Sequence, residues 1–222
     1  MLQIVPFFAV PFGFARLENC AAVNAQLREL FLQRATEGTR HANPRPYTQR
    51  NPQVFESNFQ LFKSTEPSIQ QVKSFCLQYL LRMVGQLNNY DEATMRRMLI
   101  HDDAWFHVTR RGGFFALHNH PMASWSGVYC VSQGQHDADK PSSGQLCFVN
   151  PAVAGAMYVD AGTENIKGAY GDHIRAMQLE PGQLVLFPSW VMHDVKPFEG
   201  EGERITIAFN CWFSLTGEPK HS

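Results

Sequence analysis

Two histidines two positions apart are the first residues whose spacing suggests metal chemistry. His118 and His120 stand in a strand-like segment, where side chains two apart project from the same face and can bind one metal ion. A third histidine, His193, ends an apolar run that begins at Gly182. Three neutral imidazoles suit Fe(II), Zn, Cu or Ni and leave coordination positions open, whereas a closed structural zinc site needs a fourth ligand. The sequence therefore predicts a catalytic metal site formed by His118, His120 and His193.

The other histidines are weaker candidates, because a single histidine is more often a surface or hydrogen-bonded core residue. His107 stays undecided between these roles. The remaining five lie in predicted loops or near a terminus, and we expect no metal role for them: His41, His101, His136, His173 and His221.

The segment 204–213 sorts into two faces by its period of two. One face is apolar and is predicted to be core. The other carries Arg204, Thr206, Ala208, Asn210 and Trp212, so an arginine, two small side chains and an amide stand where apolar bulk is usual. This second face is expected to line a cavity that takes an anion, because a guanidinium binds a carboxylate through two parallel hydrogen bonds. The alternative is that Arg204 is a solvated residue at an exposed strand end.

The elements that must position these residues change in kind along the chain. Helical spacing of apolar residues predicts helices over 18–33, with Asn19 as its cap, over 68–87 after Pro67, and over 91–99. A short strand is expected over 58–62, and 36–54 is expected to be a loop that could act as a lid. About eight short strands follow, over 104–110, 114–120, 126–132, 145–149, 172–178, 183–188, 192–195 and 204–213. Residues 133–144 and 152–171 are predicted surface loops near the mouth of the barrel.

This order predicts a mainly β fold with N-terminal helices, a jelly roll with two or three helices packed on one sheet. We expect a single domain over 1–222, in which 1–100 is mainly helical and 101–216 forms the β core. With 222 residues, 44% hydrophobic and 18% charged, the chain can bury a core without disulfides or structural metals.

Charge and cysteine content limit the classes of partner. A formal net charge of −1 gives no bulk attraction to nucleic acid or to an anionic membrane. The five cysteines are scattered without C-x-x-C spacing, which predicts reduced thiols in a cytoplasmic protein. The first 14 residues lack a basic region and contain two prolines, and no apolar stretch approaches the ~20 residues of a membrane span. A homodimer with two-fold symmetry is the default expectation if the chain associates.

The order His-x-His, distal His and then Arg resembles the iron(II)- and 2-oxoglutarate-dependent dioxygenases. Segments 113–131, 186–193 and 204–210 look most like the group of 2OG-Fe(II) oxygenases with an H-x-H-P…S-G-V-Y-Y-V signature. The resemblance covers the C-terminal half of the chain. It implies a double-stranded β-helix and an enzyme that uses Fe(II), 2-oxoglutarate and dioxygen on a small-molecule or peptidyl substrate. It also implies that Arg204 binds the distal carboxylate of 2-oxoglutarate, with Asn210 assisting.

The chain departs from that superfamily at three places. His120 stands where the superfamily has a carboxylate, so a three-histidine site would lose one negative charge. Cys130 replaces the second tyrosine of the signature, which weakens any hydrogen bond to the co-substrate from that position. Residues 150–152 read Asn-Pro-Ala where similar sequences have Asp-Pro-Arg, a change that we expect to affect substrate specificity.

Two other functions fit the same predicted fold. The first is a three-histidine metal cupin, which is a dioxygenase or isomerase independent of 2-oxoglutarate. It is weakened because Trp190 stands where cupins carry glycine and because no Glu follows the H-x-H motif. The second is a jelly-roll binding module without enzymatic activity. The tryptophans near the motifs, Trp105, Trp125 and Trp190, are expected to belong to an apolar pocket or, more commonly, to the sheet core.

Overall fold

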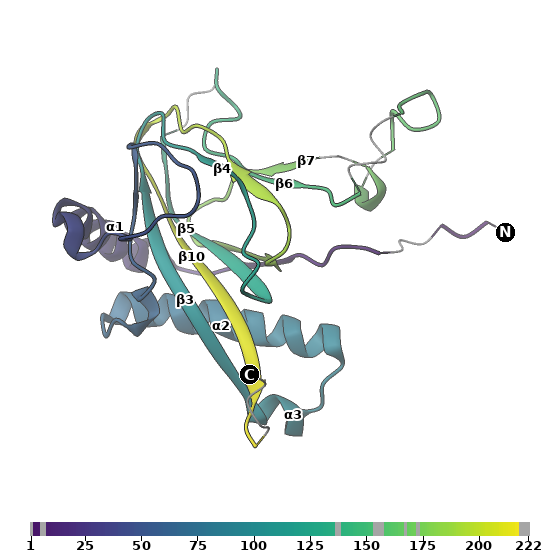
Figure 1. Cartoon of the computed structure of the whole chain (residues 1–222), viewed down its shortest axis with the longest axis horizontal. Coiled ribbons are helices and arrows are strands. Elements are labelled where there is room, and N and C mark those ends of the chain that lie inside the picture. Colours follow the sequence, from purple (N-terminus) through teal and green to yellow (C-terminus); the bar gives the residue numbers. More distant parts are fainter. Residues whose placement is uncertain are drawn as a thin grey trace.

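The computed structural model describes residues 2–4, 8–135, 139–152, 158–166, 168–171 and 174–217. In this part of the chain two antiparallel sheets pack face to face (Figure 1). The larger has the order β1-β8-β5-β10-β3-β2 and the smaller the order β4-β9-β6-β7. Their bounds are β1 Gly13–Arg16, β2 Val54–Glu56, β3 Met98–Thr109, β4 Phe115–His118, β5 Trp125–Gln135, β6 Leu146–Val149, β7 Ile174–Met177, β8 Gln183–Pro188, β9 His193–Val195 and β10 Glu201–Leu215. The predicted β fold with helices on one sheet is confirmed, and each of the eight predicted strand ranges overlaps an observed strand.

Two helices cover the outer face of the large sheet (Figure 1). Helix α1 spans Ala21–Thr36 and α2 spans Pro67–Asn88, with the proline in its first turn. The short α3 spans Glu92–Arg97 and is capped by Asp91, which accepts a hydrogen bond from the backbone of Thr94. All three predicted helices are confirmed, but the predicted cap is wrong. Asn19 has a positive φ of 53°, and the residue at the start of α1 is Cys20, whose side chain makes no capping bond.

The two faces of each central strand lie in different surroundings. Along β3 and β10, alternate apolar residues pack under the helices, among them Phe106, Ile207 and Phe209. The residues between them face the space between the two sheets. Strand β10 lies between β3 and β5 in the large sheet, so its inner face forms the centre of that wall.

The predicted strand over 58–62 is wrong. The observed strand is β2, which ends at Glu56, and Leu61–Lys63 is a 3-10 turn. The side chain of Asn58 accepts a hydrogen bond from the backbone of Gln60, which turns the chain and stops the extended run. Leu61 and Phe62 are both buried, which a turn under α2 allows and a strand with one covered face does not.

Strand β1 was not visible in the sequence pattern, because it is a four-residue edge strand that alternates between half-buried and exposed residues. The loop predicted over 36–54 is observed over 37–53, apart from the 3-10 turn Gly38–Arg40, because Thr36 ends α1 and Val54 begins β2. The predicted surface loops 133–144 and 152–171 lie partly outside the described residues, and β5 continues to Gln135. All five cysteines are free, as predicted. Among the described helices, none has the length and apolar character needed to cross a bilayer.

Candidate metal centre

The three histidines predicted from their spacing come together between the sheets. His118 ends β4 and lies directly opposite His193, the first residue of β9, across an antiparallel pair. His120 follows two residues later, where its backbone N–H donates to the carbonyl of Ser189 at 2.8 Å. One ring nitrogen from each histidine lies within 4.8 Å of the other two. This is the spacing of side chains that could share one ion, and it is the only such cluster found among the described residues.

Hydrogen bonds to carbonyl groups orient two of the three rings. Nδ1 of His118 lies 2.8 Å from the carbonyl oxygen of Ala116, and Nδ1 of His193 lies 2.9 Å from that of Val191. A carbonyl oxygen only accepts, so Nδ1 of each ring carries the proton and Nε2 keeps its lone pair for a metal. Within the described structure the ring of His120 has no such carbonyl partner, and it instead packs edge-on against Trp105.

Burial keeps the three imidazoles neutral. It is the largest cause that lowers the pKa of His193 and of His120, each to about 3, with the neighbouring histidines adding to the effect. The pKa of His118 is lowered too, again mainly by burial. Neutral imidazole is the form that binds a metal, so the cluster needs no proton removed before an ion enters at neutral pH.

The histidines line a cavity of about 500 Å³ that opens to solvent. Phe115, Leu146, Phe187 and Val195 give it a largely apolar inner wall. Tyr47 and Met122, about nine-tenths exposed, belong to its lining as well, so they stand at the mouth. Tyr47 comes from the loop predicted over 36–54, which therefore borders the entrance.

The inner face of β10 crosses this cavity as predicted. Arg204, Thr206, Ala208 and Asn210 all line it. Each lies between residues of β3 and β5, so Thr206 is flanked by His107 and Cys130, and Asn210 by Asp103 and Ser126. At about 3.3 Å per residue, the Cα atoms of Arg204 and Asn210 are ~20 Å apart.

Arg204 is a buried cation without an acidic partner. Its exposed fraction is 5%, and within the described residues no carboxylate lies within ion-pair distance of its guanidinium. Burial lowers its pKa. The nearby Cys130 does not neutralise it, because burial raises the pKa of that thiol to about 12 and keeps it protonated. The alternative of a solvated arginine at an exposed strand end is therefore wrong. A bound anion would balance this buried charge.

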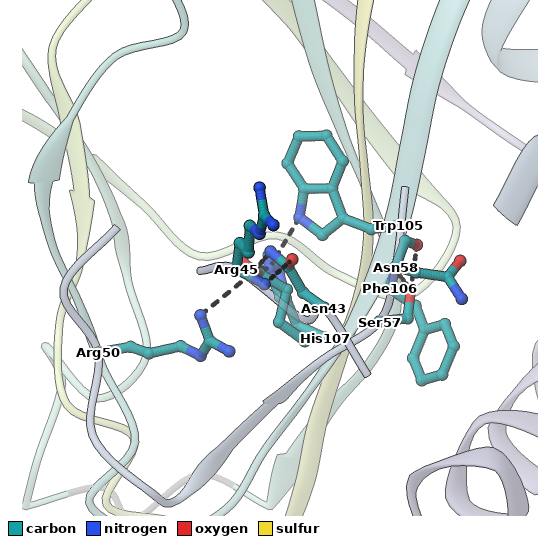
Figure 2. A network of polar contacts seen from close by, with 9 residues as sticks. Asn43, Arg45, Arg50, Ser57, Asn58, Trp105, Phe106 and His107 are labelled. Atoms are coloured by element: carbon teal, nitrogen blue, oxygen red, sulfur yellow. Dashed lines mark hydrogen bonds and ion pairs between the residues drawn. The ribbon is translucent and has the colours of Figure 1, made fainter. Parts of the chain in front are cut away.

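A second buried charge in the same wall is fully paired. Oε1 of Glu56 accepts hydrogen bonds from Asn43 at 2.6 Å and Arg50 at 3.1 Å, and Oε2 lies 3.1 Å from Nε2 of His107. Figure 2 shows Asn43 and Arg50, from the loop before β2, and Trp105, from β3, around this point. Burial alone raises the pKa of Glu56, but His107, Asn43 and Arg50 outweigh it and lower the pKa to about 2.

His107, undecided from the sequence, belongs to this network and not to the three-histidine cluster. Its Nε2 lies 2.9 Å from Nε1 of Trp105 as well as near Glu56. The indole N–H only donates and the carboxylate only accepts, so the two contacts require opposite protonation of that nitrogen and only one is a hydrogen bond at a time. Burial lowers the pKa of His107 and favours the neutral ring.

Several cavity residues were missed in the sequence. Asp103 could have been found, because it shares the strand face of Trp105 and His107 by the period of two. Asn43 and Glu56 carried no such signal. Of the three tryptophans, Trp105 lines the cavity, Trp125 packs on the core and Trp190 is 52% exposed. Residues 150–152 do not belong to the cavity lining, and Asn150 instead accepts a hydrogen bond from the backbone of Ala152.

Residues 103–210 match the family described as "Putative 2OG-Fe(II) oxygenase". This segment, just under half of the chain, is similar to the 2OG-Fe(II) oxygenases. The match begins at Asp103 in β3, ends at Asn210 in β10 and includes all three histidines and Arg204. No curated protein matches the chain.

Solved structures share the fold of this chain at low sequence identity. A prolyl-4-hydroxylase from Pseudomonas putida has a TM-score of 0.59 and 16% identity, with 94% of each chain covered. HygX from Streptomyces hygroscopicus, solved with nickel and 2-oxoglutarate bound, has a TM-score of 0.58 and 13% identity over 96% of this chain and 86% of that one. A prolyl hydroxylase from Trichoplax adhaerens, solved with a peptide fragment of hypoxia inducible factor, has a TM-score of 0.55 and 15% identity, covering 90% and 83%. The predicted double-stranded β-helix is confirmed.

The cavity fits the cofactors of the matched family, Fe(II) and 2-oxoglutarate. Three neutral imidazoles could hold one metal ion, and Arg204, which has no acidic partner among the described residues, faces the same cavity. A dicarboxylate co-substrate would supply both the negative charge that a metal-binding carboxylate would otherwise give and a partner for Arg204. The prediction of an enzyme is confirmed, and the binding module without activity is not supported.

Proposed function

We propose that the chain is a 2-oxoglutarate-dependent iron oxygenase in which His118, His120 and His193 hold Fe(II). The observation that carries this assignment is the combination of the histidine cluster and the partnerless Arg204 in one cavity. When bound, the iron with 2-oxoglutarate and dioxygen supplies the oxidising power to hydroxylate an unreactive C–H bond.

The residues of the chain orient the metal-binding rings, bind 2-oxoglutarate and exclude water. The carbonyls of Ala116 and Val191 hold the rings of His118 and His193 in the tautomer that offers Nε2. Arg204 pairs with the distal carboxylate of 2-oxoglutarate through two parallel hydrogen bonds. Thr206, two residues along the same face, is close enough to add a hydroxyl contact. The apolar inner wall keeps water away from the reacting atoms.

Asn210 has a different place in this proposal. The ~20 Å between its Cα and that of Arg204 exceeds what both side chains can span to reach one carboxylate group. Asn210 lies at the other end of the cavity wall, where its Oδ1 accepts a hydrogen bond from Ser126 at 2.7 Å. We therefore place it on the substrate side of the metal site.

The substrate is a small molecule or the side chain of a peptide. The cavity of about 500 Å³ has room for both 2-oxoglutarate and a substituent of a substrate, and it opens beside the exposed Tyr47 and Met122. Structures of the same fold bound to a peptide fragment or to hygromycin B support an entrance of this kind.

An anaerobic titration tests the assignment. Metal-free protein is titrated with Fe(II) and then with 2-oxoglutarate, and the weak visible charge-transfer band of a chelated ferrous ion is recorded. We expect the band in the wild type and in His101→Ala, a control whose imidazole contacts Ser214 far from the cluster. We expect no band in His193→Ala. Iron uptake without the band in the wild type would instead support the 2-oxoglutarate-independent cupin, and absence of iron uptake would reject the metal site.

A further inference from the structure

Three charged side chains other than histidine line the cavity: Glu56, Asp103 and Arg204. Glu56 is neutralised by Arg50 at 3.1 Å. Arg204 is the partner proposed for 2-oxoglutarate. Asp103 is left, and it makes no hydrogen bond or ion pair with any other described residue. It is a carboxylate without a partner in an active-site wall.

Asp103 lies at the opposite end of that wall from Arg204. It pairs with Asn210 across the β3–β10 ladder, whereas Arg204 pairs with Thr109. The six residue steps from Arg204 to Asn210 separate the two charges by ~20 Å along the strands. Trp105, two residues from Asp103 on the same face, has its ring centroid 5.8 Å from that of His120. Along the strands, the three-histidine cluster therefore lies between Asp103 and Arg204.

The environment of Asp103 favours a cationic partner. It is half-buried, and burial is the largest cause that raises its pKa, with Asp102 acting in the same direction. The exposed Lys63 opposes this effect but forms no ion pair with it within 4.0 Å. A cation brought into the cavity would restore the favourable solvation that burial removes from this carboxylate.

We infer that Asp103 is a substrate-binding residue that selects a protonated amine or guanidinium group. This inference rests on the proposed function, because it places the substrate between the metal site and the cavity mouth. Asp103 is two residues, or ~7 Å, along the strand from Trp105, which packs against His120. We therefore expect the cationic nitrogen of the substrate within about 7 Å of the carbon that is oxidised. Asn210 and Ser126 beside Asp103 offer neutral polar contacts to the same group.

Matched pairs of probes test the inference. Protein loaded anaerobically with Fe(II) and 2-oxoglutarate is titrated with N-acetyl methylamides of lysine against norleucine and of arginine against citrulline, and binding is measured by calorimetry. We expect the cation of at least one pair to bind wild type about ten-fold more tightly than its neutral counterpart. Asp103→Asn should reduce this preference to near one-fold, and Asp103→Glu should keep part of it.

Asp102→Asn is the matched control. It makes the same change of charge one residue away on the opposite strand face, where Asp102 lies 3.7 Å from Lys73, and it should keep the preference. A wild type that favours neither cation, or a preference that survives in folded Asp103→Asn, would overturn the inference. The charge-transfer band of the loaded protein is recorded first. A missing band rejects the proposed function, whereas a normal band without cation preference rejects this inference alone.

Discussion

Glu56 and Arg204 are two buried charges in the wall of one cavity, and their surroundings differ. Glu56 receives donors from a loop and from a neighbouring strand, and its pKa is lowered to about 2. Arg204 is as deeply buried, with an exposed fraction of 5% against 7%, yet no described carboxylate pairs with it. The fold thus provides partners for Glu56, but among the described residues it provides no acidic partner for Arg204.

The difference separates a structural charge from a binding charge. A buried ion that the protein itself pairs contributes to folding, and removing its partner leaves an unbalanced charge. A buried ion that the protein does not pair costs stability in the empty state and regains it when a ligand of opposite charge binds. Glu56 should therefore matter for stability and Arg204 for co-substrate affinity.

Arg204→Leu gives the largest expected effect. Loss of a bidentate, charge-assisted pair should raise the dissociation constant of 2-oxoglutarate about 100-fold, while Fe(II) affinity stays unchanged. Calorimetric titration of both ligands measures this, and circular dichroism should show no loss of stability, because an unpaired buried cation has been removed. A dissociation constant within about threefold of wild type would show that Arg204 does not bind the co-substrate.

Glu56→Ala should show the opposite pattern. Removing the carboxylate leaves Arg50 without its partner and should lower the free energy of unfolding by about 3 kcal/mol, with little change in 2-oxoglutarate affinity once folded. Urea unfolding measures the loss. Glu201→Ala is the control, because it breaks an exposed ion pair with Arg111 and should change stability much less. Equal losses in the two variants would contradict a special role for Glu56.

Acid should lower the stability of the wild-type protein, because it protonates Glu56. Its pKa is near 4.5 in the unfolded chain and about 2 in the folded one, so its stabilising contribution is complete above pH 4.5 and is lost as pH falls towards 2. The difference in unfolding free energy between wild type and Glu56→Gln should be about 2 kcal/mol smaller at pH 3 than at pH 6. A difference independent of pH over this range would mean that Glu56 does not titrate as described.

Gly144→Ala should give the smallest effect. A Cβ at this position would lie 3.0 Å from Cδ of Arg204, and φ at Gly144 is +65°, a conformation that alanine disfavours. We expect a stability loss of about 1 kcal/mol and a several-fold weaker affinity for 2-oxoglutarate. Gly217→Ala, at positive φ with no atom within 4 Å of its Cβ, is the control for backbone strain. Unchanged co-substrate affinity in Gly144→Ala would show that the Arg204 side chain tolerates displacement.

Local patterns in the sequence were enough for most of the fold. Helical spacing located α1, α2 and α3, and alternation located eight strands, because both periodicities follow from backbone geometry that neighbouring residues share. Local patterns failed where tertiary contacts decide the conformation. The buried Leu61 and Phe62 gave an apolar run that predicted a strand, but the chain turns there beneath α2.

The metal site, too, was only partly predictable from local patterns in the sequence. His118 and His120 are two apart in the chain and Arg204 shares a strand face with Thr206, so sequence spacing alone indicated both groups and the chemistry they support. Only the tertiary structure showed that His193 lies opposite His118. Only the tertiary structure showed that Glu56 is paired while Arg204 has no acidic partner among the described residues. Each depends on contacts between segments far apart in the chain, and pairing or isolation of a buried charge is a property of all the elements around it.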